Sequence, residues 1–210
     1  MSSTNLPKRI FCSGSPGSRW SATTQRLWAL PNFNRTDINF HTRYDRYDPA
    51  GKKFLKYFHH GTYFEHNTSY PVTLDEAKLD ATYVDPNAGT MIHRSHQYAF
   101  ILDNIKERYP NDWIWLIYRP DFECYTQWIK CGGFYIDYPD YSFYEDEPTM
   151  MREIIKQNNA KLAWVRKHNL TWEPLTKQWD LEHFGFCHQS SKEKIVENIL
   201  CCLYKGNEQN

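Results

Sequence analysis

One short segment rich in small residues has the composition of an anion-binding loop. It reads GSPGSRWS over residues 14–21 and stands between an apolar run and a segment with helical spacing. At such a junction, free backbone N–H groups and the dipole of the following helix converge on an anion. Ser18 and Ser21 add hydroxyl donors, and Arg19 adds a positive charge. The loop lacks the Gly-Lys pair of the nucleoside triphosphatase pattern GxxxxGK[ST]. A tight strand-to-helix turn without any ligand is the alternative interpretation.

The loop resembles the 5′-phosphosulfate loop of sulfotransferases, in which a Pro, a basic or small residue, Ser-Gly and Thr-Thr lie between the first strand and its helix. Two positions depart from that pattern, since Gly17 stands where many members carry Lys and Arg19 stands where Gly is common. The resemblance implies a donor, 3′-phosphoadenosine 5′-phosphosulfate (PAPS), and a nucleotide product, adenosine 3′,5′-bisphosphate (PAP). It also implies a set of donor-binding residues around the loop: Ser15, Pro16, Gly17, Ser18, Arg19, Trp20 and Ser21.

A second segment, MIHRSH over residues 91–96, resembles the strand-ending Lys-Thr-His segment of the cytosolic sulfotransferases. The resemblance makes His96 the general base that removes the acceptor's proton. It puts Arg94 in place of the Lys, and Arg94 and Arg19 become the catalytic cations. The assignment is chemically reasonable, because a neutral imidazole accepts a proton near pH 7 and a nearby cation stabilises oxygens that gain charge. His93 alternates to the other face of the strand, so His96 is preferred. An ordinary histidine at a helix start is the alternative.

A third segment gives the strongest match. Sulfotransferases follow a buried strand with Arg-x-Pro and, seven or eight positions on, a Ser at the start of a helix; that Arg and Ser bind the 3′-phosphate. Here Arg119 follows the apolar run 113–118, and Thr126 comes seven residues later. An Arg suits this task because its fork pairs with two phosphate oxygens at once. Tyr125 and Gln127 are register alternatives to Thr126, and a surface salt bridge is the alternative role for Arg119.

The elements that must position these residues alternate between strand and helix. Apolar runs predict three strands, at residues 8–13, 90–94 and 113–118. Helical spacing and capping signals predict five helices, at residues 20–30, 96–109, 122–131, from Pro148 to Val165, and from Ser190 to about residue 205. The alternation indicates an α/β fold, and the family fold is a three-layer arrangement with a mostly parallel central sheet flanked by helices and a P-loop-like phosphate-binding loop. We expect one domain over residues 1–210.

More detailed expectations concern the two C-terminal helices and residues 31–90. The long helix from Pro148 is expected to bury Met151, Ile154, Ile155, Leu162 and Val165. The last helix, opened by a capping box at Ser190 and Glu193, is expected to bury Ile195, Val196, Ile199, Leu200 and Leu203. Residues 31–90 have weak periodicity and are read as an irregular acceptor-side insert of loops, helical turns and up to two short strands. Two weaker resemblances, a strand at 170–175 and a short helix at 180–185, complete the family order.

Composition excludes some classes of partner. The chain of 210 residues has 25 basic and 25 acidic side chains, which argues against a nucleic acid or an anionic membrane as its main partner. No apolar run reaches the roughly 18 residues of a membrane span, and the polar residues 1–8 do not resemble a secretory signal. We therefore expect a cytoplasmic protein with reduced cysteines, acting on a small-molecule, glycan or peptide acceptor.

Other functions stay open at this point. The same anion loop could serve a P-loop type phosphoryl transferase, although the missing Lys weighs against it, and a non-catalytic nucleotide- or partner-binding protein could use residues 31–90 as a surface. If His96 is not the base, Glu65 and Glu76 are the next candidates. A metal is not expected, because the spacing of the clustered histidines matches no standard zinc pattern. Those histidines are His41, His59, His60 and His66.

Overall fold

The computed structural model describes residues 6–38, 43–47, 53–58, 61–64, 71–135, 145–176 and 195–209. The strands are β1 (Arg9–Gly14), β2 (Arg43–Tyr47), β3 (Lys53–Phe58), β4 (Thr62–Tyr63), β5 (Met91–Arg94), β6 (Trp113–Tyr118), β7 (Glu173–Thr176) and β8 (Ile195–Tyr204). The α-helices are α1 (Trp20–Trp28), α2 (Glu76–Asp80), α3 (Leu102–Arg108), α4 (Asp121–Lys130) and α5 (Glu147–Lys167). Three short 3-10 helices are η1 (Gln97–Phe100), η2 (Gly133–Tyr135) and η4 (Gly206–Gln209).

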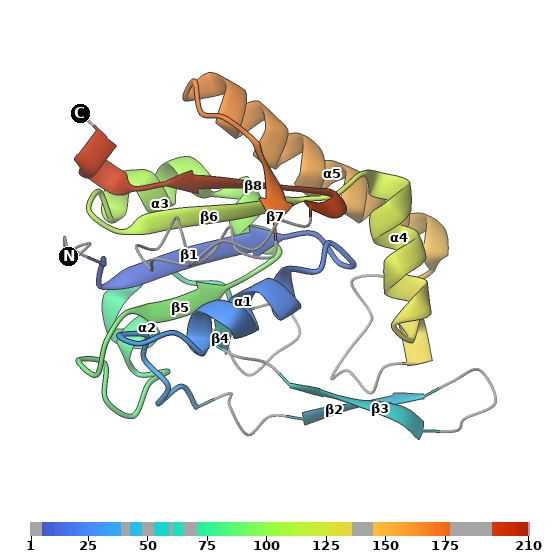
Figure 1. The fold of residues 1–210 in the computed structure, drawn as a ribbon, viewed down its shortest axis with the longest axis horizontal. Coiled ribbons are helices and arrows are strands. Elements are labelled where there is room, and N and C mark those ends of the chain that lie inside the picture. The colour runs from blue at the N-terminus through green and yellow to red at the C-terminus, as the bar shows by residue number, and fades with distance from the viewer. Residues whose placement is uncertain are drawn as a thin grey trace.

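Six of the strands form one sheet in the order β4-β5-β1-β6-β8-β7 (Figure 1). Strands β4, β5, β1 and β6 are parallel, whereas β8 runs antiparallel to both of its neighbours. The predicted α/β class is confirmed, with a mixed, mostly parallel sheet and several helices. Strands β2 and β3 form a separate antiparallel pair.

Alternating side chains of the central strands enter two apolar clusters. Ile10 and Cys12 of β1 belong to a cluster that includes Trp20 and Leu27 of α1. Phe11, between them in the sequence, belongs to a cluster with side chains of α2, α3 and α5. Strand β6 alternates in the same way and is buried along nearly its whole length. This explains its unbroken apolar sequence, because a strand that is covered on both faces has no solvent-exposed face that would need polar residues.

The predicted long helix is confirmed as α5, but its buried face was only partly predicted. Asp146 caps its N-terminus by accepting a hydrogen bond from the Thr149 N–H at 2.7 Å. Met151, Ile155 and Leu162 are only half-buried. The fully buried positions include four polar side chains: Glu153, Gln157, Asn158 and Lys161. Polar groups on a buried helix face need specific partners, so this face does more than fill a core.

The predicted last helix is wrong, because residues 195–204 form β8. This strand lies between β6 and β7, and its residues alternate between the two clusters, as Cys201 and Cys202 show. A continuous apolar run that is buried on both faces has no hydrophobic periodicity by which a strand can be told from a helix. Its two antiparallel neighbours supply the backbone hydrogen bonds that favour the strand. The capping-box residues 190–193 lie outside the described residues, as does the expected helix at 180–185.

Smaller departures occur elsewhere. The predicted helix 96–109 is divided into η1 and α3 at Ile101, whose φ of −128° breaks the helical path. The described part of residues 31–90 contains β2, β3 and β4, one strand more than expected, and β4 extends the main sheet. The expected strand at 170–175 is present as β7. Among the described residues, no helix is long and apolar enough to cross a bilayer.

Candidate anion-binding and catalytic site

The three segments singled out in the sequence lie at one edge of the sheet. Residues 15–19 follow β1, Ser95 and His96 follow β5, and Arg119 follows β6. These strands are adjacent and parallel, so their carboxyl ends meet (Figure 1). The helix after β1 packs on one face of the sheet, whereas the helices after β5 pack on the other. Ligands of α/β proteins bind at such a topological switch point, where the chains diverge.

The loop after β1 presents hydrogen-bond donors that the described residues leave free. Arg19, at the N-cap of α1, has a left-handed φ of 72° and provides no side-chain cap. No described residue accepts a hydrogen bond from the N–H groups of Arg19, Trp20 or Ser21. The hydroxyl of Ser18 is fully buried and also lacks a partner among the described residues. A helix N-terminus and an unpartnered buried hydroxyl together have the chemistry of an anion site.

Position 17 of this loop accepts only glycine. Its φ is +77°, and a Cβ there would overlap the carbonyl oxygen of Cys124 and lie 2.9 Å from the backbone nitrogen of Trp128. Both neighbours are backbone atoms of α4, so they cannot move aside as a side chain could. The loop is therefore packed against α4 at a position where no lysine fits.

Arg119 reaches this loop from the end of β6. Its Nη1 donates to the Gly17 carbonyl at 3.3 Å, and its Nε donates to the Glu123 carboxylate at 3.4 Å. The side chain is 18% exposed, so ligand atoms can approach it. Thr126 is half-buried in α4, and its hydroxyl has no hydrogen-bond partner among the described residues. Gln127, one of the two register alternatives, already donates to the Cys131 sulfur at 3.2 Å.

His96 lies directly beside the loop. Its ring packs against that of Trp20 in a tilted arrangement with centroids 4.4 Å apart, and its Nδ1 hydrogen-bonds the carbonyl of Gly14. A carbonyl only accepts, so Nδ1 carries the proton and Nε2 has the free lone pair. Burial lowers the pKa of His96 to about 3, helped by the positive charges of Lys161 and Arg94. The imidazole is therefore neutral and oriented as a base.

The two predicted catalytic cations lie in different surroundings. Arg94 is fully buried, donates to the Thr24 hydroxyl at 3.1 Å, and lies 5.2 Å from the ring centre of Trp20 and 5.8 Å from that of Tyr63. It therefore packs against the first turns of α1, next to the Trp20 ring that contacts His96. Arg19 is exposed, at the entrance of the same helix.

Sequence reasoning missed the buried lysine of this site. Lys161 of α5 donates from Nζ to the Ser15 hydroxyl at 3.0 Å and to the Ile117 carbonyl at 2.8 Å. Asn158, one turn earlier, accepts from the Ser15 hydroxyl at 2.8 Å and donates to the Arg119 carbonyl at 2.9 Å. Helix α5 thus ties the loop to the end of β6. The spacing held a signal, because Asn158 and Lys161 come four and seven residues after Ile154 on the predicted apolar face.

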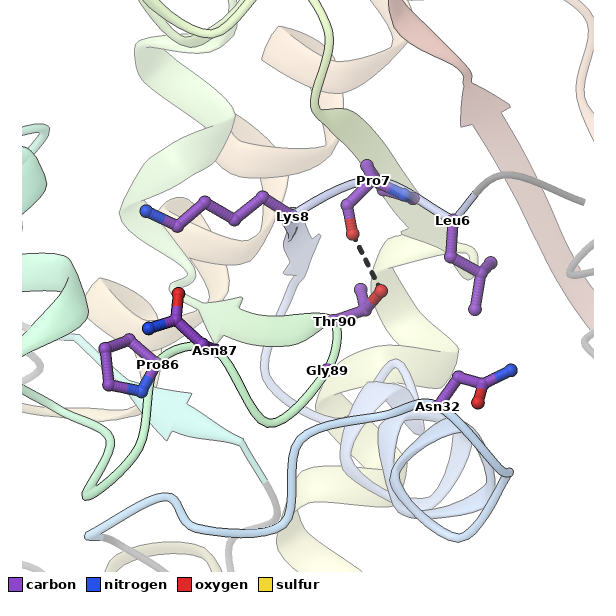
Figure 2. Close-up of a pocket in the computed structure, with 8 residues that line it drawn as sticks. All are labelled: Leu6, Pro7, Lys8, Asn32, Pro86, Asn87, Gly89 and Thr90. Carbon is purple, nitrogen blue, oxygen red and sulfur yellow. Dashed lines mark hydrogen bonds between the residues drawn. The ribbon is translucent and has the colours of Figure 1, made fainter.

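The other candidates lie elsewhere. A pocket of about 380 Å³ is at the amino ends of β1 and β5, opposite the loop (Figure 2). It is lined by Leu6, Pro7, Lys8, Asn32, Pro86, Asn87, Gly89 and Thr90. Glu76 is paired with Lys8 and Arg9 at that same end, far from His96 in the sheet, and therefore is not placed to act as its substitute. Glu65 lies outside the described residues.

No metal cluster is present in the part of the chain that the structure describes, where no three His, Cys, Asp or Glu side chains come together. The four clustered histidines, His41, His59, His60 and His66, lie outside that part. The five described cysteines are free thiols: Cys12, Cys124, Cys131, Cys201 and Cys202. Comparison of the chain with protein-family models, with curated proteins and with solved structures finds no match.

Proposed function

We propose that this protein is a sulfotransferase, moving a sulfuryl group from PAPS to a hydroxyl or amine of an acceptor. The observation that carries the proposal is the meeting of the three segments that resemble the family's motifs. Arg119 donates to the loop at Gly17, and His96 hydrogen-bonds the loop at Gly14. These segments lie about 80 and 100 residues from the loop in the sequence, and the sheet order alone brings them together.

In this proposal the loop is P-loop-like and holds the 5′-phosphosulfate. The free N–H groups at the start of α1 and the buried Ser18 hydroxyl bind its oxygens, with Arg19 at the entrance. Arg119 and Thr126 bind the 3′-phosphate, the group that distinguishes PAPS from ATP. Arg119 is suited to this, because its contacts leave Nη2 without a partner among the described residues. The nucleotide then lies along the carboxyl edge of β1 and β6.

The chemical step follows from the state of His96. Its Nε2 accepts the proton of the acceptor hydroxyl or amine while the acceptor atom forms a bond to sulfur. The bond between sulfur and the bridging phosphate oxygen breaks, and PAP leaves with that electron pair. Lys161 and Arg94 are close enough to His96 to lower its pKa in the ligand-free protein. Anionic donor beside these cations offsets their effect and makes His96 a stronger base when the donor is bound.

The geometry favours this function over the two alternatives. A P-loop phosphoryl transferase needs the Gly-Lys pair of the pattern GxxxxGK[ST], and Arg19 and Trp20 stand at those two positions here. A non-catalytic binding protein needs no neutral histidine with a fixed tautomer beside the anion loop. In this proposal the acceptor enters from the side of residues 31–90. Tyr63 of β4 belongs to that segment and contacts His96 in an edge arrangement, with ring centroids 5.8 Å apart.

Thermal shift with three nucleotides tests the proposed donor. We expect PAP to raise the unfolding midpoint more than AMP does, because only PAP has a 3′-phosphate for Arg119, and the bound ligand stabilises the folded state by mass action. A sulfotransferase also requires that ATP with Mg²⁺ stabilises the protein less than PAP does. A larger shift with ATP and Mg²⁺ would favour phosphoryl transfer, and no shift with any nucleotide would overturn both enzyme readings.

A further inference from the structure

A buried polar network beneath the anion loop centres on one charged side chain. Lys161 has no exposed surface, and its ammonium contacts only the Ser15 hydroxyl and the Ile117 carbonyl among the described hydrogen-bond acceptors. Ser15 in turn donates to Asn158, which also donates to the Asp121 carboxylate at 2.6 Å. The network therefore joins the loop, the end of β6, the start of α4 and the middle of α5.

We propose that Lys161 is a positioning residue of the anion site, holding the loop in its ligand-binding conformation and supplying a positive charge beneath it. The inference rests on the proposed function in one respect, namely that the loop binds a phosphate or sulfate group. Lys161 of α5 would then supply the positive charge that the loop itself cannot carry at position 17, where only glycine fits. The competing view is that Lys161 only stabilises the fold through its hydrogen bonds and that its charge has no role in anion binding.

The surroundings of Lys161 leave its charge available to an anion. It faces thiols on three elements, Cys12 of β1, Cys124 of α4 and Cys201 of β8, together with Asp121 of α4. Burial raises the pKa values of Cys12 and Cys124 to about 12, so these two thiols are uncharged at pH 8.

Two basic neighbours complete these surroundings. His96, after β5, is neutral, and Arg94, also of β5, is a second cation that acts on both His96 and Cys12. Asp121 is the carboxylate that faces Lys161, whereas Arg94 interacts with the buried carboxylate of Asp37. An incoming phosphate or sulfate group adds further negative charge beside Lys161.

The pH dependence separates the two views of Lys161. Burial lowers its pKa to about 8, from an ordinary value of 10.5. An anion bound above it favours the protonated form, so ligand affinity falls as pH rises through about 8. Folding stability changes in the opposite direction. The unfolded chain keeps the proton up to its ordinary pKa, so the contribution of Lys161 to stability rises between about pH 8 and 10.5.

The test compares three variants by calorimetric titration with PAP. Lys161→Met removes the charge, Lys161→Arg keeps it, and Lys156→Met removes a lysine from the same helix whose side chain is 66% exposed. We expect Lys161→Met to weaken PAP binding at pH 7 by about tenfold or more, the loss of a charge-assisted contact. Lys156→Met should bind as the parent does, and Lys161→Arg should recover part of the loss.

The pH series completes the test. The phosphates of PAP are fully ionised above about pH 7.5, so a change beyond that pH reports on the protein. We expect the parent's affinity to fall by about tenfold between pH 8 and 9.5, and that of Lys161→Met to stay flat. Equal affinity of Lys161→Met and the parent, or a parent whose affinity is flat from pH 7 to 9.5, overturns the inference. The second measurement needs only the parent, so it decides the matter even if Lys161→Met does not fold.

Titration with inorganic pyrophosphate distinguishes this inference from the proposed function. A parent that binds pyrophosphate through Lys161 but does not bind PAP overturns the sulfotransferase proposal and supports the role of Lys161. If the parent and Lys161→Met bind PAP equally tightly, PAPS is still supported as the donor, but the proposed role of Lys161 is overturned. Binding of neither anion overturns both.

Discussion

Replacing His96 by Asn is expected to lower the single-turnover rate of sulfuryl transfer by about 10²–10⁴, the usual contribution of a general base. Asn is the informative replacement, because its side-chain amide can still donate to the Gly14 carbonyl, as Nδ1 of His96 does. It has no basic atom in the position of Nε2. Affinity for PAP should therefore stay within about threefold of the parent value, well under the cost of one charge-assisted contact.

Two controls separate catalysis from folding in this experiment. His168→Asn changes a histidine at the end of α5 that pairs with Asp103, away from the loop, and should leave transfer unchanged. The unfolding midpoint of His96→Asn shows whether the site survives the substitution. A variant that folds and binds PAP normally, yet transfers sulfate as fast as the parent, excludes His96 as the base. A variant that loses stability and weakens every ligand equally assigns His96 a structural role.

Arg119→Ala is expected to weaken PAP about 10- to 100-fold more than it weakens AMP, because a charge-assisted contact to the 3′-phosphate contributes about 1.5–3 kcal/mol. Both nucleotides should lose some affinity, since Arg119 also donates to Gly17 and so supports the loop. The ratio of the two affinities is therefore the measurement that matters. Calorimetric titration of parent and variant with each nucleotide gives it.

Glu123→Gln is the matched control for Arg119. It neutralises the carboxylate that Arg119 contacts at 3.4 Å but leaves the guanidinium in place. Because a competing negative charge is removed, we expect PAP to bind at least as tightly as in the parent, and preference for PAP over AMP to be kept. If Arg119→Ala weakens PAP and AMP by the same factor, Arg119 does not bind the 3′-phosphate.

The sequence predicted the elements that carry the site because their signals are local. The apolar run of β6, the Gly-rich turn after β1 and the Pro-led start of α5 each depend on residues close together in the chain. Their parallel pairing then follows from the alternation of strands and helices. These features were enough to bring the loop, His96 and Arg119 to one edge of the sheet.

The features that sequence reasoning missed depend on distant neighbours. Residues 195–204 form a strand because β6 and β7 lie on either side of them. The hydrophobic pattern within these residues does not reveal those neighbours. Lys161 was overlooked because a lysine in a long helix is ordinarily taken as solvent-exposed. Its partners, Ser15 and Ile117, lie 146 and 44 residues away. The obligatory glycine at position 17 likewise becomes evident only with α4 packed against the loop.

Transfer of labelled sulfur is the measurement that tests the central claim most directly. The parent protein, incubated with PAPS carrying a sulfur label, is offered phenols, sugars, primary amines and tyrosine-containing peptides. We expect label to appear in one of these acceptor classes together with an equimolar amount of PAP, and His96→Asn to abolish both on the same timescale. Label that stays on the donor with every acceptor class, while PAP binds tightly, would contradict the claim and make the protein a nucleotide-binding protein without transferase activity.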